Sequence, residues 1–125
     1  MTGMHLVWKL MTNYKRGDVI LVLYPNSDLL TYKKRPALVV QADDVNTQIP
    51  QRIVALITSN LNRTGATRVR IYNNSSVCKQ MGLVTDSVVM VDNLATIQDR
   101  EVDRVIGDCP IMAQVDIALK KTFGL

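Results

Sequence analysis

The sequence predicts a mainly β domain that ends in one helix. Short runs rich in Val, Ile and Leu, separated by turn-forming residues, fill the middle of the chain, and a helical pattern of apolar residues follows them. The chain has 125 residues, which suits a single domain, and it carries no internal repeat. Five or six short strands followed by a helix favour a small antiparallel barrel with an appended helix.

The strand signal is a set of mostly continuous apolar runs, as expected for strands covered on both faces. One run is different, because Arg68 and Arg70 alternate with apolar residues, which indicates a half-exposed strand with a basic outer face. Residues 94–98 are a sixth candidate. The five expected strands are residues 18–24, 36–41, 52–58, 67–72 and 87–92.

The carboxyl end of the chain predicts a helix. Asp108 stands at a cap position and Pro110 in the first turn, and both residue types favour helix starts. Apolar residues then recur at helical spacing, and Gly124 is suited to end the helix. We expect a shorter helical turn around residues 99–107. The single domain is expected to span residues 14–125, with residues 1–13 as an extension.

Composition argues against several kinds of site. The only histidine, His5, lies in the extension, and Cys78 and Cys109 match no zinc-binding spacing, so we expect neither a metal nor a cofactor. The sequence also has no glycine-rich phosphate loop. No apolar run reaches the ~20 residues of a membrane span, and the start carries no signal-peptide pattern. We therefore expect a cytoplasmic protein with reduced thiols and no membrane contact.

The charge balance favours a polyanionic partner. Fifteen Lys and Arg residues against eleven Asp and Glu residues give a net charge of +4. This basic bias is mild, and many soluble proteins share it, so it suits a nucleic acid without establishing one.

Two strand ends carry groups that suit a phosphate. Lys33, Lys34 and Arg35 precede one apolar run, and Thr58 follows another. Each feature alone is an ordinary strand entry or turn. Combined, a fixed cation and a hydroxyl suit a phosphate that gains negative charge in a transition state. For RNA the nucleophile can be the substrate's own 2′-hydroxyl, so positioning, charge stabilisation and proton transfer suffice.

The sequence resembles MazF/PemK-type toxins of type II toxin–antitoxin systems over roughly residues 14–125. The matching segments are YKRGDVILVLYPNSDLLTYKKRPALVVQ, IVALITSN, GLVTDSVVMVDNLATI and DIALKKTFGL, in this order. The resemblance implies an SH3-like barrel that forms a homodimer. It also implies a metal-independent endoribonuclease that cleaves single-stranded RNA or mRNA at short sequences and leaves 2′,3′-cyclic phosphate and 5′-hydroxyl ends. A cognate acidic antitoxin is the implied protein partner.

The resemblance also assigns roles to individual residues. Arg35 matches the family's catalytic arginine before proline, Thr58 matches the threonine at the third strand's end, and Asp92 matches an acid that some members use. Two alternatives stay open, namely a non-catalytic toxin of the same fold, such as the gyrase-binding CcdB branch, and an RNA-binding module with little activity. The residues expected to bind RNA are Lys33, Lys34, Ser59, Asn60, Arg68 and Arg70.

Overall fold

The computed structural model describes residues 14–25, 28, 30–45 and 47–125, so the expected extension of residues 1–13 lies outside the described residues. The chain folds into a mainly antiparallel sheet followed by a carboxyl-terminal helix, as predicted. The elements are β1 (Asp18–Pro25), β2 (Tyr32–Val39), β3 (Gln51–Thr58), β4 (Arg68–Ile71), α2 (Ser76–Gln80), β5 (Ser87–Gln98), η1 (Asp99–Glu101), β6 (Val102–Asp108) and α3 (Met112–Phe123).

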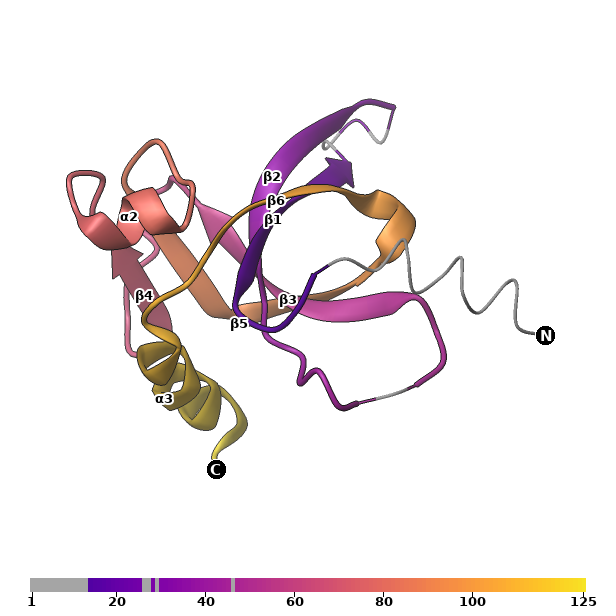
Figure 1. Cartoon of the computed structure of the whole chain (residues 1–125). Helices are drawn as coiled ribbons and strands as arrows, with labels where there is room; N and C mark the ends of the chain where they lie inside the picture. Colours follow the sequence, from indigo (N-terminus) through magenta and orange to yellow (C-terminus); the bar gives the residue numbers. More distant parts are fainter. Residues whose placement is uncertain (1–13, 26–27, 29, 46) are drawn as a thin grey trace.

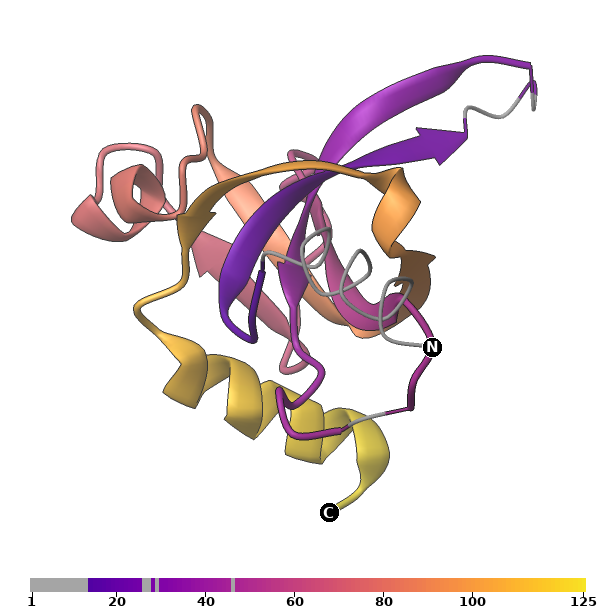
Figure 2. The same ribbon diagram turned by 45° about the vertical axis from the view of Figure 1, so that its right-hand side comes forward.

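The six strands form one curled sheet in the order β4-β5-β3-β2-β1-β6. All neighbouring strands run antiparallel. The β1–β2 hairpin projects beyond the rest of the sheet (Figure 1, Figure 2). This arrangement makes β4 and β6 the two edge strands, and strand hydrogen bonds do not join them into a closed barrel within the described residues.

Helix α2 brings the two edges together where strand pairing does not. The helix follows β4 in the chain, and the turn at its end lies against β6. The contact is so close that a methyl group on Gly82 would lie 2.1 Å from the carbonyl oxygen of Ile106. A methyl group on Gly107 would lie 2.3 Å from the carbonyl oxygen of Gln80. Only glycine fits at these two positions without moving the backbone.

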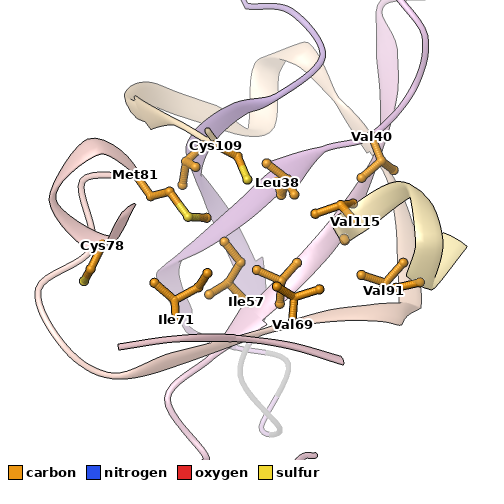
Figure 3. Packing of buried hydrophobic residues seen from close by; sticks show 14 residues of the cluster. Leu38, Val40, Ile57, Val69, Ile71, Cys78, Met81, Val91, Cys109 and Val115 are labelled. Carbon is orange, nitrogen blue, oxygen red and sulfur yellow. The ribbon is translucent and has the colours of Figure 1, made fainter. Parts of the chain in front are cut away.

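The core consists of two apolar clusters on opposite faces of the sheet. The first cluster lies between the sheet, α2 and α3, and it includes Leu38, Ile57, Met81 and Val115 (Figure 3). The second cluster includes the next residues along the same strands, since successive side chains of a strand point to opposite faces. Its members are Tyr14, Ile20, Val22, Ala37, Val39, Val54, Leu56 and Ile97. The central strands are therefore covered on both faces, which explains their continuous apolar runs.

Helix α3 is held to the sheet by packing and by one ion pair. The helix lies along β5 and β4 (Figure 1), and Val115 and Ala118 are its buried residues. Arg16 pairs with Asp116 of this helix and donates a hydrogen bond from Nε to the Val40 carbonyl oxygen at 3.0 Å. Gly124 ends the helix in the left-handed conformation, as predicted.

The predicted helical turn at residues 99–107 is wrong over most of its length. Only Asp99–Glu101 is helical, and Val102–Asp108 is a strand paired with β1. Two irregularities interrupt this pairing, and they break the two-residue alternation that would have revealed a strand. Asp108 therefore ends β6 instead of capping α3, whose cap residue is Ile111.

Two further differences from the sequence-based expectations concern β5 and α2. The expected strands 87–92 and 94–98 are one strand, β5, which stays paired with β3 across an irregularity between Met90 and Leu94. Helix α2 was not predicted from the sequence. The five-residue helix is too short to show apolar periodicity, although Ser75 caps it by accepting a hydrogen bond from the Cys78 backbone N–H at 3.1 Å.

Candidate functional site

A pocket of about 460 Å³ lies at the ends of β2 and β3. Strand β2 contributes its three consecutive cations to the wall, and the end of β3 contributes Thr58 and Ser59. The opposite wall comes from residues 82–85, which follow α2, and from Arg104 of β6. Five of the residues singled out in the sequence, Lys33, Lys34, Arg35, Thr58 and Ser59, thus meet at one place.

The strand register sets Arg35 opposite Thr58. The paired residues of β2 and β3 are Val39 with Val54, Leu38 with Ala55, and Ala37 with Leu56. The strand pairing ends there, and continuing the same register by two positions points Arg35 towards Thr58. At that point β2 remains paired only with β1, where Arg35 faces Val22. The pocket opens where β2 and β3 separate.

Alternation decides which of these side chains share a face. Arg35 and Thr58 each lie two residues from a member of the second apolar cluster, Ala37 and Leu56, so both belong to that face. Lys34 and Ser59 belong to the other face. The pocket collects residues of both faces because it lies at the strand ends, but the pair of cation and hydroxyl shares one face.

The same face continues across the sheet to β4. Val88 of β5 is paired with Thr58 on one side and with Arg70 on the other. In the next row, Met90 is paired with Leu56 and with Arg68. Directly opposed residues of antiparallel strands point to the same face. The two arginines predicted on a basic outer strand face therefore share the face of the Arg35–Thr58 pair.

The hydroxyl of Thr58 is oriented by the turn that follows it. The backbone N–H of Asn60 donates a hydrogen bond to Thr58 Oγ1 at 3.1 Å. The oxygen is thus used as an acceptor, which leaves the hydroxyl hydrogen free to be donated to a ligand. Asn60 does not line the pocket in the described structure, so it affects the site through its backbone hydrogen bond to Thr58.

Asp92 is not brought together with Arg35 and Thr58. Its carboxylate accepts hydrogen bonds from Arg68 Nε at 2.6 Å and Nη2 at 2.9 Å, and it does not line the pocket in the described structure. The hydrogen bonds from Arg68 hold the pKa of the Asp92 carboxyl below its usual range. Because β5 runs on to Gln98, Asp92 lies within a strand and not at a strand end, as the sequence had suggested.

The pocket is electropositive. Its charged lining residues are all cations within the described part of the chain, namely Lys33, Lys34, Arg35 and Arg104. Asp103 stands beside the pocket and offsets part of this charge, with one carboxylate oxygen 3.4 Å from both Lys34 Nζ and Arg104 Nη1. A surplus of fixed positive charge remains, which suits a phosphate group.

Arg104 and the wall at residues 82–85 were missed by the sequence analysis. Arg104 was hidden because its segment was expected to be helical, whereas β6 places it at the pocket. The segment 82–85 carries no charge and no catalytic motif, so only the fold reveals its position. Val84 in this wall is exposed, but its position at the pocket depends on α2, which the sequence pattern does not reveal.

The described residues offer neither a candidate metal site nor a candidate membrane-spanning helix. They contain no group of three or more His, Cys, Asp or Glu side chains that could hold a metal ion. None of the helices in the described ranges is long and apolar enough to cross a membrane.

A match to a family model shows to which protein family this chain belongs. A family model described as "PemK-like, MazF-like toxin of type II toxin-antitoxin system" matches residues 15–123. The chain belongs to this toxin family. No curated protein matches the sequence significantly.

Solved MazF-like structures share the fold of this chain. A Mycobacterium tuberculosis toxin, MazF-mt6, is 26% identical, with a TM-score of 0.64 and coverage of 85% of this chain and 97% of that one. An endoribonuclease in complex with its cognate antitoxin, from a mycobacterial species, is 23% identical, with a TM-score of 0.69 and coverage of 90% and 96%. A MazF from Deinococcus radiodurans is 17% identical, with a TM-score of 0.66 and coverage of 90% and 97%.

Proposed function

We propose that this MazF-like toxin is an endoribonuclease that cleaves single-stranded RNA, mRNA included, without a metal ion. The observation that carries the proposal is that Arg35 and Thr58 line one electropositive pocket, just beyond the last paired residues of β2 and β3. Membership in a toxin family and the likeness to MazF-mt6 support the same conclusion. The pocket supplies a cation and a hydroxyl donor where a scissile phosphate would lie.

The substrate provides its own nucleophile in this proposal. The 2′-hydroxyl attacks the adjacent phosphorus, so that a bond forms between the 2′-oxygen and phosphorus while the bond from phosphorus to the 5′-oxygen breaks. Water takes the proton of the 2′-hydroxyl, and a proton from water reaches the departing 5′-oxygen. The products are a 2′,3′-cyclic phosphate and a 5′-hydroxyl, and no oxidant, reductant or metal is consumed.

Arg35 and Thr58 stabilise the charge that develops on the phosphate. An arginine side chain keeps its proton at neutral pH, so Arg35 acts as a fixed cation and not as an acid or base. Thr58 donates its hydroxyl hydrogen to a second phosphate oxygen, because its own oxygen already accepts from Asn60. Preorganised donors of this kind typically contribute ~10²–10³ in rate each.

Lys33, Lys34 and Ser59 contact the RNA backbone at the pocket wall in this proposal. Arg68 and Arg70 extend the same face across the sheet, although Asp92 and Asp86 partly neutralise them. We leave Asp92 out of the chemistry, since its carboxylate is occupied by Arg68 away from the pocket.

We further propose that the toxin works as a cytoplasmic homodimer and is held inactive by an acidic antitoxin. The positive pocket supports an acidic partner, because the same cations that attract phosphate attract carboxylates. A related endoribonuclease has been solved in complex with its cognate antitoxin.

The test is cleavage of a panel of single-stranded RNAs in the presence of EDTA. We expect Arg35→Ala to lower the cleavage rate by ~10²–10³, whereas Asp92→Asn, the matched change of a charged residue outside the pocket, keeps it within a few-fold. A 2′,3′-cyclic phosphate end is identified because phosphatase removes a linear 3′-phosphate but leaves the cyclic phosphate in place until mild acid opens its ring.

Other outcomes would contradict the proposal in different ways. Equal rates for wild type and Arg35→Ala would remove Arg35 from the mechanism. Tight, salt-sensitive RNA binding without cleavage would favour a binding module. Inhibition of gyrase without RNA cleavage would favour the CcdB-like alternative.

A further inference from the structure

Tyr72 is an exposed aromatic side chain at the end of the face that carries Arg35 and Thr58. It directly follows β4, and its side chain is 58% exposed. The Arg70 guanidinium lies over its ring, 4.8 Å from the ring centroid. Because Arg70 shares the row of Thr58 and Val88, the ring of Tyr72 belongs to the same face as the proposed catalytic pair.

The ring is held in place by its surroundings. The carbonyl oxygen of Tyr72 accepts hydrogen bonds from the Ser75 hydroxyl at 2.6 Å and from the Ser75 backbone N–H at 3.1 Å. The next residue, Asn73, donates its backbone N–H to Asp86 at 2.8 Å. The backbone on which the ring stands is therefore fixed before any ligand arrives, which lowers the entropy cost of binding.

Arg70 retains unused hydrogen-bonding capacity. Its Nε is buried and has no hydrogen-bond partner in the described structure, and its ion pair with Asp86 spans 3.6 Å. A buried donor without an acceptor costs free energy. The Arg70 guanidinium thus stacks on the Tyr72 ring, while its Nε–H still lacks a hydrogen-bond acceptor.

The position of Tyr72 suits an RNA strand that crosses the sheet. Two strand spacings separate Thr58 from Arg70, which amounts to about 10 Å. Tyr72 lies two residues beyond Arg70, just past the end of β4, which adds about 7 Å in the perpendicular direction. An RNA strand with its scissile phosphate at Arg35 and Thr58 reaches this ring within a few nucleotides.

We propose that Tyr72, backed by Arg70, is a stacking platform for one base of the RNA near the cleaved bond. The inference rests on the proposed endoribonuclease function and adds to it a residue that positions the substrate. The second face of the ring stacks on the base, and Arg70 contacts its phosphate or its edge. Stacking on an aromatic ring tolerates every base, so Tyr72 contributes affinity and alignment and does not select a base.

The experiment replaces the bases of a well-cleaved RNA one at a time by an abasic ribose. Binding is measured by fluorescence anisotropy with fluorescein-labelled RNA, and cleavage is measured in parallel. For the wild type we expect one position near the cleaved bond to lose about 5- to 100-fold in affinity. In Tyr72→Ala this position should cost no more than its neighbours.

Two variants separate stacking from a structural role. Tyr72→Phe keeps the ring and should keep the abasic penalty, and Tyr32→Ala removes another exposed tyrosine and should leave it unchanged. An equal penalty in wild type and Tyr72→Ala overturns the platform. RNA that binds with this penalty but is never cleaved overturns the endoribonuclease and keeps the platform. RNA that does not bind at all overturns both.

Discussion

Tyr14 and Asp99 form a buried polar pair that the proposed chemistry does not use. Both residues are buried, and the Tyr14 hydroxyl donates a hydrogen bond to Asp99 Oδ1. Burial raises the pKa of Tyr14, and the hydrogen bond to Asp99 raises it further. The guanidinium of Arg52 lies 5.8 Å from the centre of the Tyr14 ring. The hydrogen bond joins the segment before β1 to the residue that follows β5, so we expect the pair to contribute to the stability of the fold.

We therefore expect Tyr14→Phe to destabilise the fold by about 1–3 kcal/mol, because the Asp99 carboxylate loses a partner in a buried place. The effect also depends on pH. The folded-state pKa of Tyr14 lies above the unfolded value near 10. Its stabilisation is complete below pH ~10 and is lost as the pH rises through the folded-state pKa.

Urea unfolding of both proteins at pH 7 and between pH 10 and 11 measures these effects. The wild type should lose stability over the alkaline range, and Tyr14→Phe should lack the part of this loss that Tyr14 causes. Identical alkaline losses in the two proteins would contradict the assignment.

Single residues of the site were partly predictable from sequence. Arg35 and Thr58 stand next to apolar runs whose ends are visible in the sequence, so their meeting at one edge could be expected. Asp92 was misplaced because its partner, Arg68, lies 24 positions earlier, and a pairing between two strands leaves no local signal. The hydrogen bond that orients Thr58 was also missed, although its two-residue spacing is a common turn pattern.

At the scale of elements, the turn that ends α2 packs closely against the backbone of β6. The turn at Gly82 has a φ of +73° and faces the backbone of Ile106. Gly124 has almost the same φ, +70°, but no atom lies within 4 Å of a methyl group placed there. The two glycines thus share one backbone conformation and differ in the space around them.

This comparison gives a matched pair of variants. Gly124→Ala should cost about 1 kcal/mol, the ordinary penalty of a side chain at positive φ. Gly82→Ala should cost about 2–3 kcal/mol more, because its methyl group also collides with β6. Chemical unfolding of both variants measures the difference, and equal losses would show that α2 can move away from β6 freely.

The elements that could not be predicted are the ones that depend on this junction. Strand β6 has no clean alternation because its pairing with β1 slips twice. Helix α2 is too short for a periodic signal. Strands β1 and β3 were predicted to within one residue at each end, since each is a long apolar run. Strand β2 was expected over residues 36–41 but spans Tyr32–Val39, because pairing with β1 continues through the exposed cations. Sequence patterns reveal burial, and they fail where contacts between distant segments set the conformation.

At the scale of the whole molecule, the net charge of +4 is unevenly distributed. Four cations line the pocket, and Asp103 forms ion pairs with two of them. Binding of single-stranded RNA should therefore weaken steeply with salt, because each neutralised phosphate adds about 0.7 to the slope of log K against log salt.

We expect Lys33→Ala to reduce this salt slope by about 0.7, whereas Lys121→Ala on α3 should leave it unchanged. Anisotropy titrations with one RNA at several salt concentrations measure both slopes. Equal slopes for wild type and Lys33→Ala would show that the RNA does not pass the β2 side of the pocket.

The way β2 is shared between its neighbours has a mechanical consequence. Strand β2 is paired with β1 from Leu38 to Tyr32 but with β3 only from Val39 to Ala37. Arg35 is therefore joined by strand pairing to the projecting β1–β2 hairpin, whereas Thr58 is joined to β5. We expect the hairpin to bend as a lever arm with its pivot near Ala37. A protein that pulls on the hairpin can separate the two halves of the proposed catalytic pair without touching either of them.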